Sequence, residues 1–210
     1  MKFDHHLHTS RHSPDSVMDP WKMLDQARKI GLDGVVITEH DHQWEADELA
    51  ELNRAGKGLK VFSGVEVSAR EGHFLVYGLP DLDEVGPGIG VGELLKVVDR
   101  LGAAIVAAHP FRWLQPFDEI VARHGAAFHG VEYVSNNVTA ETRAQADTLL
   151  AKSPMARTGS SDAHDVDTLG CYYSEFDGPI ESMADFVAAL RRGAVSPRHR
   201  VGARLTSGPV

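Results

Sequence analysis

Short apolar runs rich in β-branched residues alternate along the chain with helical patterns, and this alternation is what most constrains the fold. Residues 34–38 form a continuous apolar run typical of a strand buried on both faces, and residues 103–108 form another. Between such runs, apolar residues recur at helical spacing, as in residues 20–30, which Asp19 and Pro20 precede as a helix-start signal and Gly31 follows as an end signal. The alternation predicts an α/β fold with βαβ units and a mainly parallel sheet.

We expect one α/β domain spanning residues 1–210, without a linker or an internal repeat. The predicted strands, about seven, cover residues 2–8, 34–38, 61–67, 73–79, 103–108, 130–134 and 155–158. The predicted helices cover residues 20–30, 43–54, 91–101, 117–123, 140–152 and 182–191. This map fits an open doubly wound sheet and a closed barrel equally, and periodicity alone does not separate them.

Histidine is the unusual component, with 12 residues among 210. The single cysteine, Cys171, excludes an internal disulfide framework and a cysteine-based zinc finger. The formal net charge of −9 argues against extended nucleic-acid binding by charge alone. No run of 18 apolar residues suggests a membrane span, and the N-terminus lacks the apolar stretch of a signal peptide, so we expect a cytoplasmic protein.

The predicted strands run into residues that commonly ligate metals. These residues belong to the segments 4–8, 39–42, 66, 73, 109 and 162–164. In parallel α/β folds the C-terminal strand ends are where ligands bind, so residues at the ends of separate strands converge on one point.

The local spacing also suits metal binding. Alternate residues of a strand face one side, so Asp4, His6 and His8 would share a face, with Asp4 placed to orient one imidazole through its other ring nitrogen. Imidazoles and carboxylates without cysteine fit zinc, manganese, iron or nickel, whereas calcium takes oxygen ligands. The sequence therefore predicts a transition-metal or zinc site.

Six motifs occur in an order that resembles the polymerase and histidinol phosphatase (PHP) family of metal-dependent phosphoesterases, over residues 4–164. The motifs are Asp4-His5-His6-Leu7-His8, Thr38-Glu39-His40-Asp41, Gly64-Val65-Glu66, Gly72-His73, Ala108-His109-Pro110 and Ser161-Asp162-Ala163-His164. The resemblance implies a distorted (β/α)7 TIM-like barrel with a trinuclear site at its C-terminal mouth. The ligands it implies are His6, His8, Asp15, His40, Glu66, His73, His109, Asp162 and His164.

Within this resemblance, Glu66 is expected to bridge two metals. Two positions depart from the family pattern. Glu39 stands where the family has Asp, which leaves its role open between a ligand and a supporting residue. Asp15 lies in a segment whose spacing varies in the family, so His12 is an alternative ligand.

The resemblance implies three divalent ions, zinc, manganese or iron, that activate a hydroxide to attack a phosphate monoester. Three such ions carry more positive charge than their carboxylate ligands return, and this excess suits a dianionic phosphate ester. The expected substrate is therefore a small phosphorylated molecule, although the chain has a negative net charge. Nucleic acid is not favoured, and no feature of the sequence encodes an oligomeric state.

Several residues near the predicted strand ends are candidates for substrate contact. Arg112 follows the Ala-His-Pro-Phe segment and is placed to clamp a phosphate, and Arg11 and Arg70 in other loops are similar candidates. For each arginine, an ordinary surface position is the alternative. His42 is a candidate proton donor to the leaving group or a solvent-facing loop residue. Asn137 either lines the mouth or forms a turn.

Two other functions remain open from the sequence. The first is a nuclease-type phosphoesterase acting on oligonucleotide ends, favoured slightly by the arginine-rich residues 191–204. The second is a non-catalytic structural or regulatory module, which the full set of candidate ligands argues against. Residues 86–92 are glycine-rich but lack the features of a phosphate-binding loop or a dinucleotide site, so they are predicted to be a connection.

Overall fold

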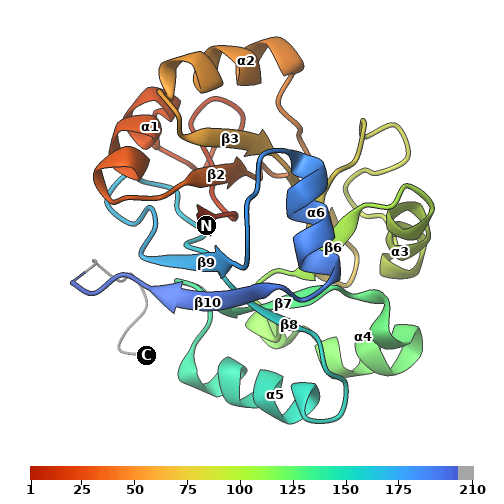
Figure 1. Cartoon of the computed structure of the whole chain (residues 1–210). Coiled ribbons are helices and arrows are strands. Elements are labelled where there is room, and N and C mark those ends of the chain that lie inside the picture. The colour runs from red at the N-terminus through yellow and green to blue at the C-terminus, as the bar shows by residue number, and fades with distance from the viewer. Residues whose placement is uncertain (203–210) are drawn as a thin grey trace.

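The computed structural model describes residues 1–202 and contains two five-stranded sheets (Figure 1). The first sheet has the order β10-β9-β1-β2-β3 and the second β4-β5-β6-β7-β8. The strands are β1 (Lys2–Asp4), β2 (Gly34–Ile37), β3 (Lys60–Ser63), β4 (Val65–Ala69), β5 (Gly72–Tyr77), β6 (Ala104–Ala107), β7 (Gly130–Val134), β8 (Ala156–Gly159), β9 (Tyr172–Phe176) and β10 (Val195–His199).

All six predicted α-helices are confirmed with shifts of a few residues at their ends. They are α1 (Pro20–Lys29), α2 (Ala46–Ala55), α3 (Val91–Arg100), α4 (Phe117–His124), α5 (Ala140–Leu150) and α6 (Met183–Arg191), with short 3-10 turns η1 (Arg112–Leu114) and η2 (Gly125–Ala127). Figure 1 places α1 and α2 beside β2 and β3, and α4 and α5 on the side of β7 and β8. The predicted cap is confirmed, because the Asp19 side chain accepts hydrogen bonds from the first backbone N–H groups of α1.

Fewer strand pairs are parallel than the alternation of strands and helices predicted. The pairs β1–β2, β2–β3, β6–β7 and β7–β8 are parallel, whereas β4–β5, β5–β6, β1–β9 and β9–β10 are antiparallel. Strands β9 and β10 were not predicted. In β10, Pro197 lies within the strand, which is tolerated because this strand is at the edge of its sheet.

The closed barrel is not confirmed, because the two sheets of residues 1–202 do not join into one continuous ladder. β9 pairs with β1 and thereby occupies the edge that β8 would need. Isolated parallel bridges at Leu7–Ala163 and His40–Glu66 connect the two sheets, and an apolar cluster that contains Phe3 and Val36 of the first sheet and Leu75 and Val106 of the second lies between them. The result is a mixed α/β fold whose two sheets share a core.

A bend at Gly64 explains why the predicted strand over residues 61–67 is two strands. A Cβ atom at this position would lie 2.8 Å from Cδ1 of Tyr77 and 2.9 Å from the backbone oxygen of Val76, so only glycine fits without displacing its neighbours. The chain passes from β3 in the first sheet to β4 in the second at this point. The bend brings Glu66 beside His40, which continues from β2.

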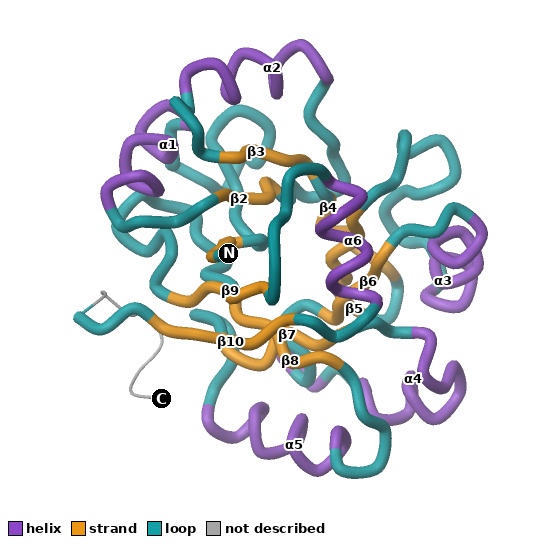
Figure 2. Tube along the Cα trace, viewed as in Figure 1, coloured by secondary structure: helices purple, strands orange, loops and turns teal. Residues whose placement is uncertain are grey.

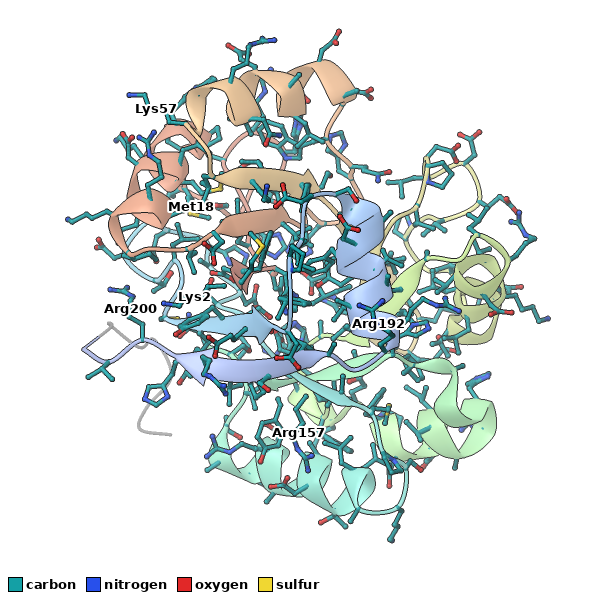
Figure 3. All side chains as sticks on the ribbon, in the orientation of Figure 1. Lys2, Met18, Lys57, Arg157, Arg192 and Arg200 are labelled. Atoms are coloured by element: carbon teal, nitrogen blue, oxygen red, sulfur yellow. The ribbon has the colours of Figure 1, made fainter. Side chains whose placement is uncertain are left out.

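Three apolar clusters stabilise this arrangement. One contains the packed rings of Phe3, Phe176 and Phe186, which join β1, β9 and α6. The other two lie under α1 and α2 and under α3 and α4. In Figure 3, the charged side chain of Lys57 lies at the outer edge, whereas Met18 is fully buried. Among the described residues, no helix is long and apolar enough to cross a membrane.

The topology gathers the candidate ligands at one edge. β1, β2, β6 and β8 all run toward this edge, and β5 runs away from it, so its second residue, His73, also lies there. The chain that continues β1 beyond Asp4 is drawn as loop in Figure 2 and carries His6 and His8.

Candidate metal centre

Five histidines converge on the buried carboxylate of Glu66. Its exposed fraction is 1%, which makes it a fully enclosed acid. Glu66 Oε2 lies 3.1 Å from His6 Nε2, 3.0 Å from His8 Nε2 and 3.2 Å from His40 Nδ1. Glu66 Oε1 lies 2.9 Å from His73 Nδ1 and 3.3 Å from His109 Nε2.

Two further carboxylates complete the cluster. Asp162 Oδ1 lies 3.2 Å from His6 Nε2 and 3.3 Å from His8 Nε2. Asp15 Oδ2 lies 3.2 Å from Nε2 of both His40 and His164. All nine candidate ligands are therefore brought together from segments that lie up to 158 residues apart, from His6 to His164.

The donor atoms overlap in sets compact enough for a metal ion. Such sets, with ligand atoms within 4.8 Å of one another, are His6–His8–Glu66–Asp162, His40–Glu66–His73 and His8–His40–His164. His8, His40 and Glu66 each occur in two of them. The donors are imidazole nitrogens and carboxylate oxygens, which fit a divalent metal of the zinc, manganese or iron kind.

The charges in this cluster are strongly coupled. Burial alone would raise the pKa of Glu66, but the surrounding imidazoles, His6 first, hold it well below its usual range. Burial alone would lower the pKa of His6, yet the carboxylates of Asp162, Glu66 and Glu132 raise it well above its usual range. Buried carboxylates thus require positive charge here, which protonated histidines supply in the absence of a metal.

The surroundings of His8 indicate whether a cation fits this cluster. Its Nε2 atom is buried and has no hydrogen-bond partner, although two carboxylate oxygens lie within 3.3 Å. Burial would lower the pKa of His8, but Asp162 and Glu66 raise it to about 9. An unpartnered imidazole nitrogen enclosed by carboxylate oxygens is the arrangement expected of a metal ligand.

Glu132, in β7, supports the cluster, and the sequence analysis did not identify it. Its Oε1 lies 3.0 Å from His6 Nδ1 and accepts a hydrogen bond of 2.6 Å from Ser160 Oγ. Its Oε2 accepts a hydrogen bond of 2.7 Å from the backbone N–H of His109. A carboxylate that binds Nδ1 of His6 leaves Nε2 free to ligate a metal. The signal that could have found it is a glutamate within the apolar run 130–134.

Asp4 does not have the predicted role of orienting His6 or His8. Its oxygens accept hydrogen bonds from the backbone N–H and the hydroxyl of Ser161 and from the N–H of Gly170. Burial raises its pKa to about 6 despite these bonds. Asp4 instead fixes Ser161, which directly precedes Asp162 in the chain.

Glu39 anchors the loop that carries Asp15 and is not a member of the cluster. Its carboxylate accepts hydrogen bonds from the N–H and hydroxyl of Thr9, the hydroxyl of Ser13 and the indole N–H of Trp44. Four donors satisfy its oxygens, so a supporting role explains this glutamate better than metal ligation.

His12, the alternative to Asp15, lies outside the cluster. Its Nε2 is 3.2 Å from Glu48 Oε2, and its ring packs at a tilt against that of His42 with 4.1 Å between centroids. The position of Asp15 between His40 and His164 therefore favours the carboxylate over the imidazole. His42, a candidate proton donor, packs against His12 rather than against the histidines around Glu66.

The three candidate arginines differ in position. Arg11 is paired with Glu48 at 2.8 Å, and Arg70 lies 3.8 Å from Glu93; both are exposed. Within residues 1–202, neither forms an ion pair with a carboxylate of the cluster. The structure therefore does not bring these two side chains to the predicted phosphate site.

Arg112 does lie at the cluster. Its Nη1 is 4.0 Å from Asp162 Oδ2, and its guanidinium lies 4.0 Å from the ring centre of Trp113. Asn137 donates a hydrogen bond to the same carboxylate oxygen. Asp162 is thus held by Asn137 and faces Arg112, so both predicted mouth residues contact one candidate ligand.

The backbone is strained at this position. His109 and Asp162 have φ angles of 27° and 52°, and Phe111, Trp113 and Leu114 have φ angles of 67°, 53° and 61°. Such conformations are costly for residues other than glycine and cluster at functional sites, where the surrounding contacts hold them. Two of them are at the candidate ligands His109 and Asp162, and three are in the loop between His109 and Gln115.

Glu132→Gln tests the role of this carboxylate. The amide cannot accept hydrogen bonds through both atoms, so either His6 Nδ1 or the N–H of His109 loses its acceptor. We expect metal affinity, measured by competition with a chelator, to fall by roughly 10–100-fold. Glu175→Gln, at an exposed ion pair with Arg198, is the control and should leave affinity unchanged. Equal affinities for the two variants would contradict the role of Glu132.

Comparisons with known proteins show which proteins this chain resembles. A family model described as PHP-associated matches residues 140–195, which include Asp162 and His164. An uncharacterized protein of Methanocaldococcus jannaschii is 29% identical over 120 residues, covering 53% of this chain and 68% of that protein.

Solved structures share the fold at low identity. PsfC from Pseudomonas syringae has a TM-score of 0.71 at 22% identity, over 95% of this chain and 91% of that one. A protein of Bifidobacterium adolescentis assigned as a metal-dependent phosphoesterase has a TM-score of 0.62 at 21% identity, over 77% and 87%. The lesion-specific endonuclease PfuEndoQ from Pyrococcus furiosus has a TM-score of 0.65 at 17% identity, over 93% and 57%. Together these matches confirm the resemblance to the PHP family that the motifs predicted.

Proposed function

We propose that this PHP-like chain is a metal-dependent phosphoesterase that hydrolyses phosphate monoesters. The observation that carries the proposal is the convergence of five imidazoles on the two oxygens of the buried Glu66, all within 3.3 Å. The name of the Bifidobacterium adolescentis neighbour supports the same reaction class.

We assign the nine ligands to three groups, one for each proposed ion, with His8, His40 and Glu66 within reach of more than one group. His6, His8, Glu66 and Asp162 form the first group through Nε2 and carboxylate atoms. The other oxygen of Glu66 forms the second group with His73 and His109. The third group consists of Asp15, His40 and His164. The proposal therefore keeps Glu66 as a bridge, with zinc, manganese or iron as the ions.

Divalent ions at such sites lower the pKa of water and stabilise negative charge on a phosphoryl group. In the overall reaction, an oxygen from water forms a bond to phosphorus, the ester P–O bond breaks, and the alcohol leaves with a proton from water. Arg112 would hold the phosphoryl oxygens through its guanidinium, which lies beside Asp162. Glu132 and Asn137 would fix the orientations of His6 and Asp162.

A nuclease-type activity is the second candidate, favoured by the endonuclease from Pyrococcus furiosus, which matches 93% of this chain. The arginines of the C-terminal segment support it little. Arg191 donates to the backbone oxygen of Ala103, Arg198 pairs with Glu175, and Arg204 lies outside the described residues. A non-catalytic module is the third candidate.

One assay separates these candidates. The metal-free protein is loaded with manganese, zinc or iron(II) and tested on small phosphate monoesters, on phosphodiesters and on short oligonucleotides. We expect monoester hydrolysis that a chelator abolishes and metal restores. Preferential release of nucleotides from oligonucleotides would instead support the nuclease. No hydrolysis of any ester under any metal would contradict an enzymatic function.

A further inference from the structure

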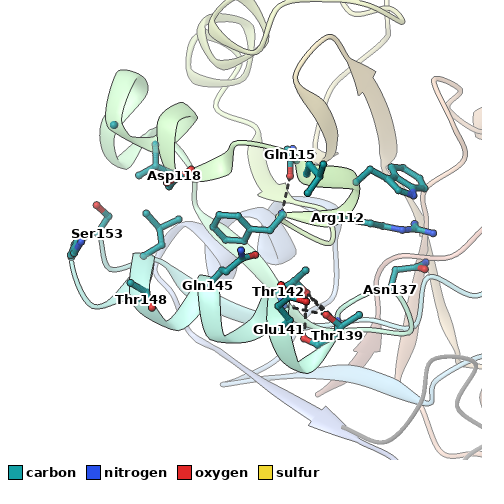
Figure 4. A pocket seen from close by; sticks show the side chains of 17 residues that line it. Arg112, Gln115, Asp118, Asn137, Thr139, Glu141, Thr142, Gln145, Thr148 and Ser153 are labelled. Atoms are coloured by element: carbon teal, nitrogen blue, oxygen red, sulfur yellow. Dashed lines mark hydrogen bonds between the residues drawn. The ribbon is translucent and has the colours of Figure 1, made fainter.

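A large recess adjoins the metal centre, and none of the nine candidate ligands lines it. It has a volume of about 840 Å³ and lies between α4, α5 and the loop that contains η1 (Figure 4). Arg112 and Asn137 belong both to this recess and to the surroundings of Asp162. The recess therefore begins where the phosphoryl group is proposed to bind.

The recess is much larger than a phosphoryl group and within the range of pockets that enclose whole organic ligands. Along α5, the side chains of Thr142, Gln145 and Thr148 line it, and Figure 4 shows them on one helix across from Asp118 of α4. These groups donate and accept hydrogen bonds without net charge.

The formal charges of the side chains that line the recess cancel. Arg112 and Lys152 are its cations, and Asp118 and Glu141 are its anions. A strand of nucleic acid requires positive groups along its backbone, which a recess of this composition does not supply. An uncharged ligand with many hydroxyl groups fits better.

Apolar surface accompanies these polar groups. Phe111, Val121 and Leu149 line the recess. Trp113 also lines it, with an exposed fraction of 71%, and the centre of its ring is 5.8 Å from that of His73. Sugar rings and flat heterocycles both pack on such surface while their hydroxyls bind polar side chains. Trp113 thus links the recess to the second group of ligands.

We infer that this recess binds the leaving group of the substrate, and that this leaving group is an uncharged, hydroxyl-rich molecule of about two rings. The inference rests on the proposed phosphoesterase function and narrows its substrate class. Sugars and nucleosides share this chemistry, whereas glycerol and ethanolamine are too small to fill the space.

Four substrates test the inference on the metal-loaded protein: phosphoethanolamine, a disaccharide phosphate, a nucleoside monophosphate and a 5′-phosphorylated oligonucleotide. We expect kcat/KM for one of the two-ring esters to exceed that for phosphoethanolamine by at least about tenfold. The better of the two identifies the source of the leaving group. A preference for phosphoethanolamine or for the oligonucleotide would overturn the inference.

A matched pair of variants tests whether the recess causes the preference for two-ring esters. Gln145→Trp places an indole in the recess from an exposed position, and Ala144→Trp places one on the same helix outside it. Gln145→Trp should lower kcat/KM for the two-ring ester by at least about tenfold and keep kcat/KM for phosphoethanolamine within about twofold of the parent value. Ala144→Trp should not show this selective loss. Equal effects of the two variants, or equal losses on both substrates, would contradict the inference while leaving the proposed function intact. Failure to cleave any ester would overturn both.

Discussion

Replacing Glu66 by glutamine should remove most of the bound metal and lower phosphoesterase activity by about three orders of magnitude. The carboxylate lies at the centre of five imidazoles, and both of its oxygens are used. An amide keeps the size of the side chain but loses the negative charge, and its nitrogen cannot ligate a cation. Metal content by mass spectrometry and kcat/KM on a monoester are the two measurements.

The control for Glu66→Gln is Glu71→Gln. Glu71 lies five residues along the chain and accepts a hydrogen bond from the backbone N–H of Val91, outside the cluster. Circular dichroism should show both variants folded. A Glu66→Gln protein that binds metal as the parent does would contradict the bridging role. Normal metal content with lost activity would assign Glu66 to the chemistry rather than to metal binding.

The second large effect is expected at Arg112. Arg112→Ala should lower kcat/KM by roughly 100-fold while metal content stays unchanged, because the guanidinium lies beside Asp162 without being a ligand. Arg112→Lys keeps the charge but loses the planar pair of donors, so we expect it to recover only part of the activity. Measuring both kcat/KM and metal content distinguishes a loss of phosphoryl binding from a loss of ions.

Arg11→Ala and Arg70→Ala provide the matched controls. The Arg11 side chain pairs with Glu48, and the Arg70 side chain lies beside Glu93. Both should keep kcat/KM within about twofold, since exposed ion pairs contribute little. If either control lost as much activity as Arg112→Ala, the placement of the phosphoryl group beside Arg112 would be wrong.

Local patterns predicted most of the secondary structure. The helices were readable because their caps and apolar spacing are local signals, as at Asp19 and Pro20 before α1. The two strands β9 and β10 were missed for different reasons. β9 alternates buried and half-buried residues over only five positions, and Pro197 in β10 removes an N–H that a central strand would need.

The closure of the sheet could not be predicted, because it depends on which strand occupies an edge. β9 pairs with β1 through a contact between residues far apart in the chain, Phe3 and Ser174. The bend at Gly64 has the same origin, since the backbone of Val76 and the ring of Tyr77 exclude a side chain there.

Most candidate ligands were predictable because they lie near strand ends in recognisable motifs, whereas Asp15 lies in the loop between β1 and α1. The supporting residues were not. Glu132 lies in an apolar strand, and its contact with His6 spans 126 residues. Asp4 was expected to orient an imidazole, but its side chain binds Ser161 instead. Spacing within one strand defines which residues share a face, but not which other segment approaches that face.

The central claim is that the cluster around Glu66 holds the divalent ions on which ester hydrolysis depends. The most direct measurement is a titration of the metal-free protein with manganese or zinc, in which bound metal per chain and monoester hydrolysis are recorded in the same samples. We expect activity to rise with metal occupancy and to reach its maximum as the three ligand groups fill. Binding of less than one ion per chain, with no hydrolysis of any phosphate ester, would contradict it.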